Sequence, residues 1–186
     1  MHGVNCPRLA AMAAGLYGIL AAVTSCATGE MPSKIDAGVR AARDQCAAQI
    51  PGCNTAAEKA SGMLVFPEVT KAAIGIGGSY GEGALIAGDR TAGYYSITSA
   101  SAGLQLGAQK TAQIIMFMTP EALDKFRNSS GWEAGANAQV TMIDEGKAAN
   151  IRSVMADNPV IAFFFGQQGL MGDLSIEGSK ITKLER

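Results

Sequence analysis

The amino-acid sequence predicts an α+β domain in which about eight to ten mostly antiparallel, glycine-rich strands form a sandwich or a barrel-like sheet. The chain of 186 residues contains 23 glycines and only 6% aromatic residues, which suits tight turns and closely approaching strands. Beyond Gly62, short apolar segments follow one another with turn residues between them and few helical patterns, which favours antiparallel connections. Helical patterns occur in an N-terminal amphipathic segment, in a short segment at residues 56–60 and in a segment near residues 120–128.

Residues 1–25 have the pattern of a lipoprotein signal peptide. Arg8 provides a positive start, Leu9 to Val23 an apolar stretch, and Thr24-Ser25 the small residues before a cleavage site. The run from Leu20 to Cys26 is a lipobox, which predicts lipidation of Cys26 as the first residue of the mature chain. Two or three fatty chains, palmitate among them, would anchor the protein stably to a membrane. A plain signal peptide is the alternative. An uncleaved transmembrane helix is disfavoured, because the apolar stretch is shorter than the roughly 20 residues that such a helix needs.

Residues 26–33 read as a short tether, and residues 34–186 as a single domain large enough to bury a core. The formal net charge of −1 gives no basic footprint for nucleic acid. Because Ala27 stands where an aspartate often marks inner-membrane retention, we expect an exported protein anchored to the outer membrane, on its periplasmic or surface face.

The first predicted helix covers residues 34–50, where apolar side chains recur at helical spacing until Pro51-Gly52 ends the pattern. A second, shorter helix is expected over residues 56–60, capped by Asn54 or Thr55. Cys46 and Cys53, the two thiols left in the mature chain, are expected to pair, because disulfides are common in exported proteins and Pro51-Gly52 would reverse the chain between them. Their six-residue separation does not suit a CxxC redox or zinc motif.

The β-type segments alternate with turn signals through the rest of the chain. A third helix opens at Thr119-Pro120, with Thr119 as its cap. Residues 88–92 have the composition of a hairpin turn between two strands. Strands are expected at 63–66, 73–78, 83–87, 93–98, 102–108, 113–118, 139–143, 160–165, 170–176 and 179–184.

Several residues with catalytic or ligand-binding potential favour a structural interpretation. The glycine-rich run 75–83 fits no phosphate-loop spacing and is better read as a bulge or tight bend where another backbone passes close by. The run 163–165, three phenylalanines, is expected to fill both faces of a buried strand rather than to enter a membrane. Trp132, Met116 and Met118 are expected in the core.

No catalytic centre, metal site or cofactor is predicted. The single histidine, His2, leaves with the signal peptide, which excludes Ser-His-Asp and Cys-His systems and the common zinc triads. Carboxylates such as Glu82, Glu121, Glu133 and Asp144-Glu145 lie near predicted turns or helix ends. A hydrolase using two of them would need both in one cleft, which a sequence does not show.

Seven blocks in order resemble the SYLF domain family, and the resemblance runs from about residue 35 to the C-terminus. The blocks are Met63 to Val69 with Lys71, Gly77 to Leu85, Gly93-Tyr94-Tyr95, Gly103 to Gln109, Gly131-Trp132, Gly166 to Met171, and Gly178 to Thr182. The resemblance implies lipid binding, notably of phosphoinositides in eukaryotic members, actin association in the fungal branch, and no enzymatic activity. Bacterial members are commonly exported lipoproteins, which agrees with the lipobox.

We therefore expect a lipid-anchored envelope protein whose non-catalytic domain binds an anionic lipid or another amphiphile, without a cofactor. Lys71, Arg90, Lys110 and Lys180 are candidate contacts to a lipid headgroup, because lysine and arginine attract phosphate. The helix at 34–50 adds Lys34, Arg40 and Arg43 as cations. The alternative is a structural or adhesive envelope protein that acts through contacts with other proteins.

Overall fold

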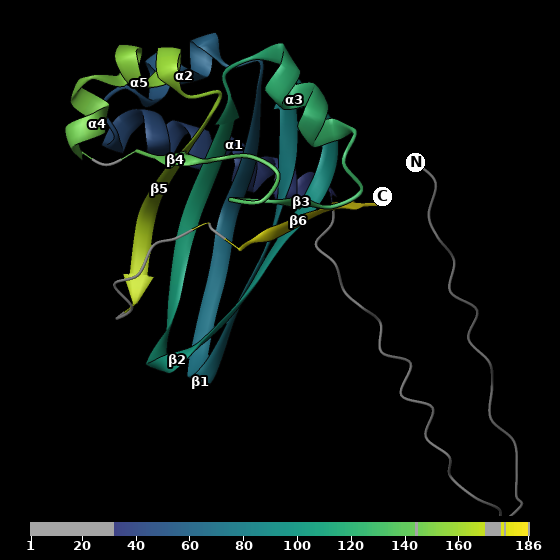
Figure 1. Ribbon diagram of the computed structural model, residues 1–186, viewed down its shortest axis with the longest axis vertical. Coiled ribbons are helices and arrows are strands. Elements are labelled where there is room, and N and C mark those ends of the chain that lie inside the picture. Colours follow the sequence, from purple (N-terminus) through teal and green to yellow (C-terminus); the bar gives the residue numbers. More distant parts are fainter. Residues whose placement is uncertain (1–31, 144, 170–175, 177, 186) are drawn as a thin grey trace, which may run out of the picture.

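The computed structural model describes residues 32–143, 145–169, 176 and 178–185, and it confirms the α+β class (Figure 1). The lipobox, with Cys26, and most of the strand expected at 170–176 lie outside the described residues. In chain order the elements are α1 (Pro32–Gln49), α2 (Cys53–Lys59), β1 (Gly62–Ala87), β2 (Arg90–Phe117), α3 (Pro120–Arg127), β3 (Trp132–Glu133), β4 (Thr141–Met142), α4 (Glu145–Ala149), α5 (Ile151–Asp157), β5 (Val160–Gly169) and β6 (Lys180–Leu184).

One strand, β2, organises the six-stranded sheet that the described residues form. It pairs with β1 along its length, with β6 over residues 94–98 and with β5 over residues 109–117. The short strands β3 and β4 extend the sheet beyond β6 and β5, in the order β3-β6-β2-β5-β4. All pairs are antiparallel except β4 with β5.

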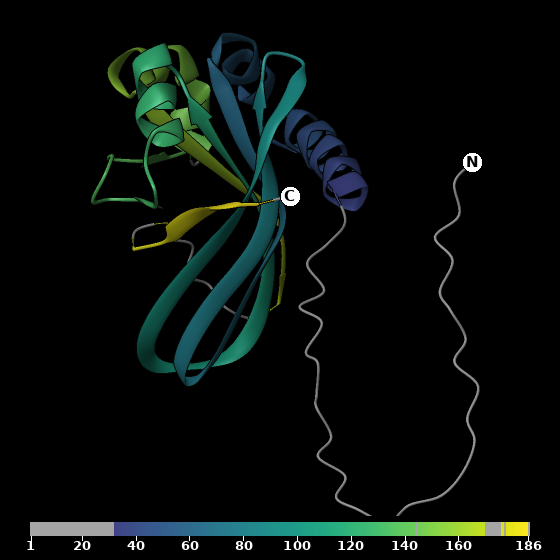
Figure 2. The ribbon, with the colours of Figure 1, turned by 90° about the vertical axis from the view of Figure 1, so that its right-hand side faces the viewer.

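The β1–β2 hairpin is bent back on itself, so that its two halves pack across one another (Figures 1 and 2). A Cβ atom on Gly83 would overlap the carbonyl oxygen of Val65, and one on Gly81 would lie 2.7 Å from that of Glu68. Only glycine allows this approach of two backbone segments. The interpretation of the glycine-rich run as a close backbone passage is therefore confirmed.

Fewer, longer strands replace the many short ones that the sequence suggests. Segments 63–66, 73–78 and 83–87 are all parts of β1, and segments 93–98, 102–108 and 113–118 are all parts of β2. Pro67 and the glycines look like strand ends in the sequence, but the pairing register shifts at Phe66/Val69 and at Ile74/Ile76 instead. β-bulges absorb these residues within the β1–β2 ladder, so pairing continues past them.

The central strands are buried on both faces, and each face has its own core. Met63 and Val65 face one core together with the buried side of α1, whereas Leu64 and Phe66 face the other together with α3. Phe163 and Phe165 join the first core and Phe164 packs against the second, as the sequence predicts. This alternation with period two explains why the strands read as continuous apolar runs.

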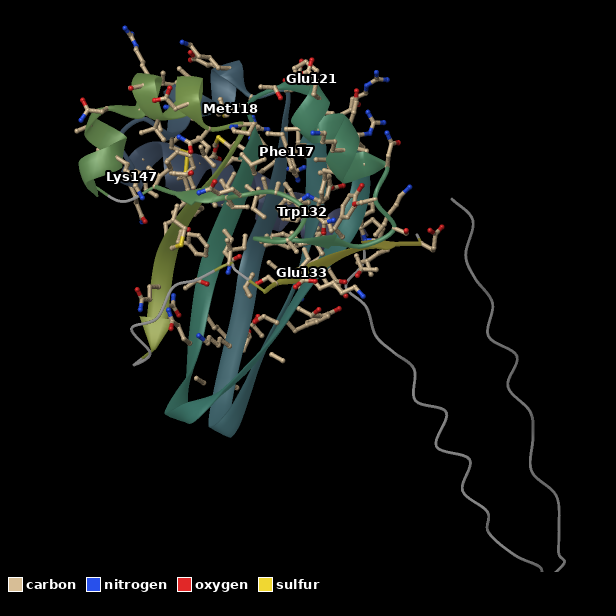
Figure 3. All side chains as sticks on the ribbon, in the orientation of Figure 1. Phe117, Met118, Glu121, Trp132, Glu133 and Lys147 are labelled. Atoms are coloured by element: carbon tan, nitrogen blue, oxygen red, sulfur yellow. A yellow bond between two sulfur atoms is a disulfide. The ribbon has the colours of Figure 1, made fainter. Side chains whose placement is uncertain are left out.

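The second core is built around aromatic rings. Phe126 of α3 lies 4.8 Å from the Phe117 ring and 5.8 Å from the Trp132 ring, measured between centroids. Figure 3 labels Phe117 and Trp132 in this part of the molecule. Trp132 is buried and Met116 is fully buried, which confirms both as core residues, while Met118 is partly buried against the first core.

The three predicted helices form, with differences at their ends. Thr119 caps α3 by accepting a hydrogen bond from the Ala122 amide at 3.2 Å, as expected. The predicted cap of the second helix is wrong: α2 begins at Cys53 after Gly52, whose φ of 83° no other residue adopts easily, and no side chain caps it. No helix among the described residues is long and apolar enough to cross a membrane.

Helices α4 and α5 have no counterpart in the sequence-based prediction. Ile151 and Met155, four residues apart and both buried, are the helical signal that was available. These helices lie between β4 and β5, which are the parallel pair, and a parallel connection requires such a crossover. The expectation of connections without helices therefore fails at this one place.

Candidate binding site

A cleft of about 330 Å³ lies where α1 and α2 meet the face of the sheet that carries the first core. Its floor is apolar and comes from both long strands: Met63 of β1, and Ile114 and Met116 of β2. One stripe of α1 and one side of α2 form its walls. The residues that line it are Arg40, Arg43, Asp44, Ala47, Cys53, Asn54, Ala57, Met63, Ile114 and Met116.

The α1 wall presents one acidic and two basic side chains to the cleft. Arg40, Arg43, Asp44 and Ala47 follow one another at helical spacing, so they share one side of α1. Ile35, Val39, Ala42 and Cys46 of the same helix are buried against the sheet. Arg40 and Arg43 are exposed, and among the described residues neither forms an ion pair with a carboxylate. Two guanidinium groups thus border an apolar floor.

The Cys46–Cys53 disulfide ties the two helical walls together. The structure contains this bond, with the two Cα atoms 6.0 Å apart, and both residues are buried. The start of α1 is fixed separately, because Thr91 and Tyr94 of β2 each donate a hydrogen bond of 3.1 Å to the Asp36 carboxylate. The end of α1 is therefore tied to α2, and its start is tied to β2.

The four cations proposed from the sequence lie in different places rather than in one patch. Lys71 and Lys110 are in adjacent strands, β1 and β2, but in neighbouring register positions that point to opposite faces. Arg90 begins β2 at the turn of the hairpin, and Lys180 begins β6 opposite Thr98. None of the four lines the α1–α2 cleft.

Lys110 has a local partner. Its ammonium group lies 2.8 Å from the Glu68 carboxylate, with both side chains about half exposed. The pair borders a small cleft of about 130 Å³ on the other flank of α1, which Gln45 and Gln168 also line. An exposed pair of this kind contributes little to stability.

From the sequence, Arg40 and Arg43 are predicted to be cations of the first helix, but not to be part of a binding site. Their signal was present, since they lie beside the apolar stripe of an amphipathic helix. The missing information was which strands the stripe covers. Met63, Ile114 and Met116 come from segments far apart in the sequence, and only the antiparallel pairing of β1 with β2 brings them together.

Polar side chains are also buried on the second-core face of β2. Gln109, Thr111 and Gln113 pair with Lys71, Val69 and Phe66. The side-chain amide of Gln109 is 2% exposed, and neither its nitrogen nor its oxygen has a hydrogen-bond partner. These groups lie away from the α1–α2 cleft and do not line it.

Other ionisable side chains of the described residues lie outside the α1–α2 cleft. No group of three or more histidine, cysteine or acidic side chains in this part of the chain is placed to hold a metal ion. Burial raises the pKa of Tyr95 above its usual value, and the nearby Arg127 guanidinium opposes this shift. Tyr95 packs against Phe126 in the second core, at 5.0 Å between ring centroids, and is not part of a cleft.

The structure thus combines a curled sheet with a helix-walled, amphiphilic cleft. Residues 98–186 match the Ysc84 family model, described as Las17-binding protein actin regulator, a family also called SYLF. The family consists of binding domains. No curated protein matches the chain. The matched segment contains Ile114 and Met116, whereas the two arginines of the cleft precede it.

Proposed function

We propose that this chain is a lipid-anchored cell-envelope protein whose non-catalytic domain binds an anionic amphiphile in the α1–α2 cleft. The observation that carries the proposal is the pair Arg40 and Arg43, without carboxylate partners among the described residues, above the apolar floor of Met63, Ile114 and Met116. A ligand with an anionic head and an apolar tail matches both parts of this cleft.

The chemistry of each part supports such a ligand. Guanidinium groups form charge-assisted hydrogen bonds to phosphate or carboxylate, often two at a time. Apolar surface that the tail covers contributes about 25 cal/mol per Å². The volume of about 330 Å³ is at the lower end of the range for ligand sites, so we expect the cleft to take a headgroup and the first part of one chain.

The proposed attachment to the membrane depends on Cys26. Its acylation would keep the domain at a bilayer surface, where amphiphiles are concentrated, and would place it in the envelope of the cell. The Cys46–Cys53 disulfide supports an oxidising compartment, since such bonds are uncommon in the cytosol.

The test is co-sedimentation of a soluble chain beginning at Thr28, which retains every described helix and strand, with vesicles of phosphatidylcholine containing phosphatidylglycerol. Arg40→Gln and Arg43→Gln should each weaken binding about threefold to tenfold, because each removes a charge-assisted contact. Lys125→Gln is the matched control: it removes one exposed cation from α3, on the other side of the sheet.

Equal binding by all three variants and the parent chain would contradict the proposed site. Binding that salt does not weaken, and that is the same on vesicles without the anionic lipid, would contradict a headgroup contact.

The family description supports a second candidate function, contact with a protein partner, because it names Las17 binding and actin regulation. For this chain such a partner would make it a structural or adhesive envelope protein. Capture of a defined protein by the Thr28 chain that persists in Arg40→Gln, with no vesicle binding by either, would favour this candidate.

A further inference from the structure

The bend of the β1–β2 hairpin contains two long uncharged segments of the described chain. No charged residue occurs between Lys71 and Glu82 in β1 or between Arg90 and Lys110 in β2. Glycine, alanine and serine dominate both segments, with Ile74, Ile76, Leu104 and Leu106 among them. We call residues 72–81 and 99–108 together the uncharged bend.

The uncharged bend is a two-stranded ribbon that stands apart from the rest of the sheet. Among the described residues, β6 pairs with β2 only at 94–98 and β5 only at 109–117, so residues 99–108 pair with β1 alone. Figures 1 and 2 show the bend at the end of the molecule opposite α2, α3, α4 and α5. A projecting ribbon of two strands is marginally stable in water by itself.

Its surface suits a bilayer interface. Tyr80 is 51% exposed and is the one large hydrophobic side chain that is exposed among the described residues. Its hydroxyl donates a 2.6 Å hydrogen bond to Glu82 at the border of the bend. Tyrosine is enriched at membrane interfaces because its ring is apolar and its hydroxyl polar. Ala72, Ala100 and Ala108, also exposed, add no charge.

The border of the bend is electrically balanced. Lys110 pairs with Glu68, and Lys71 and Glu82 add one charge of each sign. Contact through the bend would therefore depend weakly on lipid charge, unlike the arginine-lined cleft. The open edges of a two-stranded ribbon carry unpaired backbone groups, which keeps it in the headgroup region rather than in the hydrocarbon core.

Only a short segment connects the proposed anchor, Cys26, to the start of α1. About five residues separate Cys26 from the start of α1, and fully extended they span at most about 20 Å. In Figure 2 the N-terminal end of α1 is the end of this helix that lies nearer to the bend. This reach is compatible with a bilayer that holds Cys26 on the side to which the bend projects.

We propose that the uncharged bend inserts into the headgroup region of the membrane and orients the domain on it. This goes beyond the proposed cleft function and needs no ligand in the cleft. The occupant is a lipid surface, and the alternatives, a second copy of the chain or another protein, are outcomes of the test.

The test uses the processed, acylated protein in phosphatidylcholine vesicles, with Ala100→Cys labelled by a fluorophore that responds to polarity. Cys46 and Cys53 are bonded to each other, so the new thiol is available for labelling. We expect the emission to shift to the blue and to be quenched by spin-labelled lipid. Lys125→Cys on α3, at the opposite end, is the control and should show neither effect.

A second variant tests whether insertion depends on the absence of charge in the bend. Ala72→Glu, in the position paired with Ala108, should abolish most of the Ala100 signal, whereas Arg40→Gln should leave it unchanged. If Arg40→Gln also abolished the signal, the bend would not bind independently, and its proposal would fail while the cleft proposal stood. Unchanged vesicle binding by the Thr28 chain carrying Arg40→Gln or Arg43→Gln, with the Ala100 signal intact, gives the opposite result: the cleft proposal fails and the bend proposal stands.

Three outcomes overturn the bend proposal. Emission at Ala100 that matches the Lys125 control shows no insertion. An equal blue shift at both positions shows that the whole domain, not the bend, lies on lipid. A blue shift that grows with protein concentration in detergent without vesicles shows that a second copy covers the bend.

Discussion

At the scale of single residues, glycine decides whether the long hairpin can fold across itself. Gly83 faces the Val65 carbonyl and Gly81 faces the Glu68 carbonyl, so β1 packs on its own first half with no room for a Cβ atom. Arginine decides the character of the cleft in the same way, since Arg40 and Arg43 supply its cations. The sequence shows where these glycines and arginines occur, but it does not show which residues they contact.

Gly83→Ala should therefore destabilise the domain. The added methyl group would overlap backbone, which cannot move as a flexible side chain does, and overpacking of this kind costs about 1–3 kcal/mol or more. Urea unfolding followed by circular dichroism measures the free energy of unfolding. Gly78→Ala is the control, because its new Cβ atom would make an ordinary contact of 3.4 Å with the Ser99 carbonyl. Equal effects of the two substitutions would contradict the close-passage argument.

At the scale of secondary-structure elements, the disulfide joins α1 to α2 and so holds the two walls of the cleft. Helix α2 is short and begins without a side-chain cap, and the disulfide, its buried Ala56 and its packing against α5 hold it in place. The stability of this wall therefore affects both the fold and the proposed site.

Cys46→Ala together with Cys53→Ala should lower the free energy of unfolding by about 2–3 kcal/mol, because the unfolded chain loses a loop constraint. It should also weaken vesicle binding by the Thr28 chain, since α2 lines the cleft. Thermal unfolding with and without a reducing agent checks the cause: the reductant should lower the Tm of the parent chain and leave that of the variant unchanged. A parent chain insensitive to reductant after denaturation in its presence would contradict this role.

At the scale of the whole molecule, the curled sheet separates two surfaces. The helices and the arginine-lined cleft lie toward one end and the uncharged bend projects from the other (Figure 1). The single strand β2 contributes to both, because it contains residues 99–108 of the bend and Ile114 and Met116 of the cleft floor. The arrangement lets one domain bind a ligand and contact a surface at separate sites.

The proposed lipid anchor determines the location of the protein in the cell. The native protein extracted in detergent should have an intact mass that corresponds to a chain starting at Cys26 plus its fatty chains. Cys26→Ser should abolish acylation and leave the unprocessed chain. A native protein with the mass of the full, unmodified chain, recovered from the cytosol, would contradict the lipobox and the envelope location.

The sequence predicted the elements whose signals are local. The amphipathic period of α1, the Thr119 cap of α3 and the alternation in β5 are properties of neighbouring residues, and the structure confirms them. The α2 start and the helices α4 and α5 were not predicted, because a left-handed Gly52 and two short helical turns give weak local signals. The four cations proposed as headgroup contacts lie apart from one another, because the pairing register decides which residues are neighbours across the sheet.

The sequence by itself determined the α+β class, the family resemblance, the glycines that permit close backbone contact and the stretches without charge. Composition and local periodicity carry these features, so no knowledge of distant contacts is needed. Only the tertiary structure decided that two of those stretches form one projecting bend, and that α1 arginines lie over strand residues far along the chain. Pairing between β1 and β2 creates both surfaces, and no local sequence pattern specifies which distant strands pair.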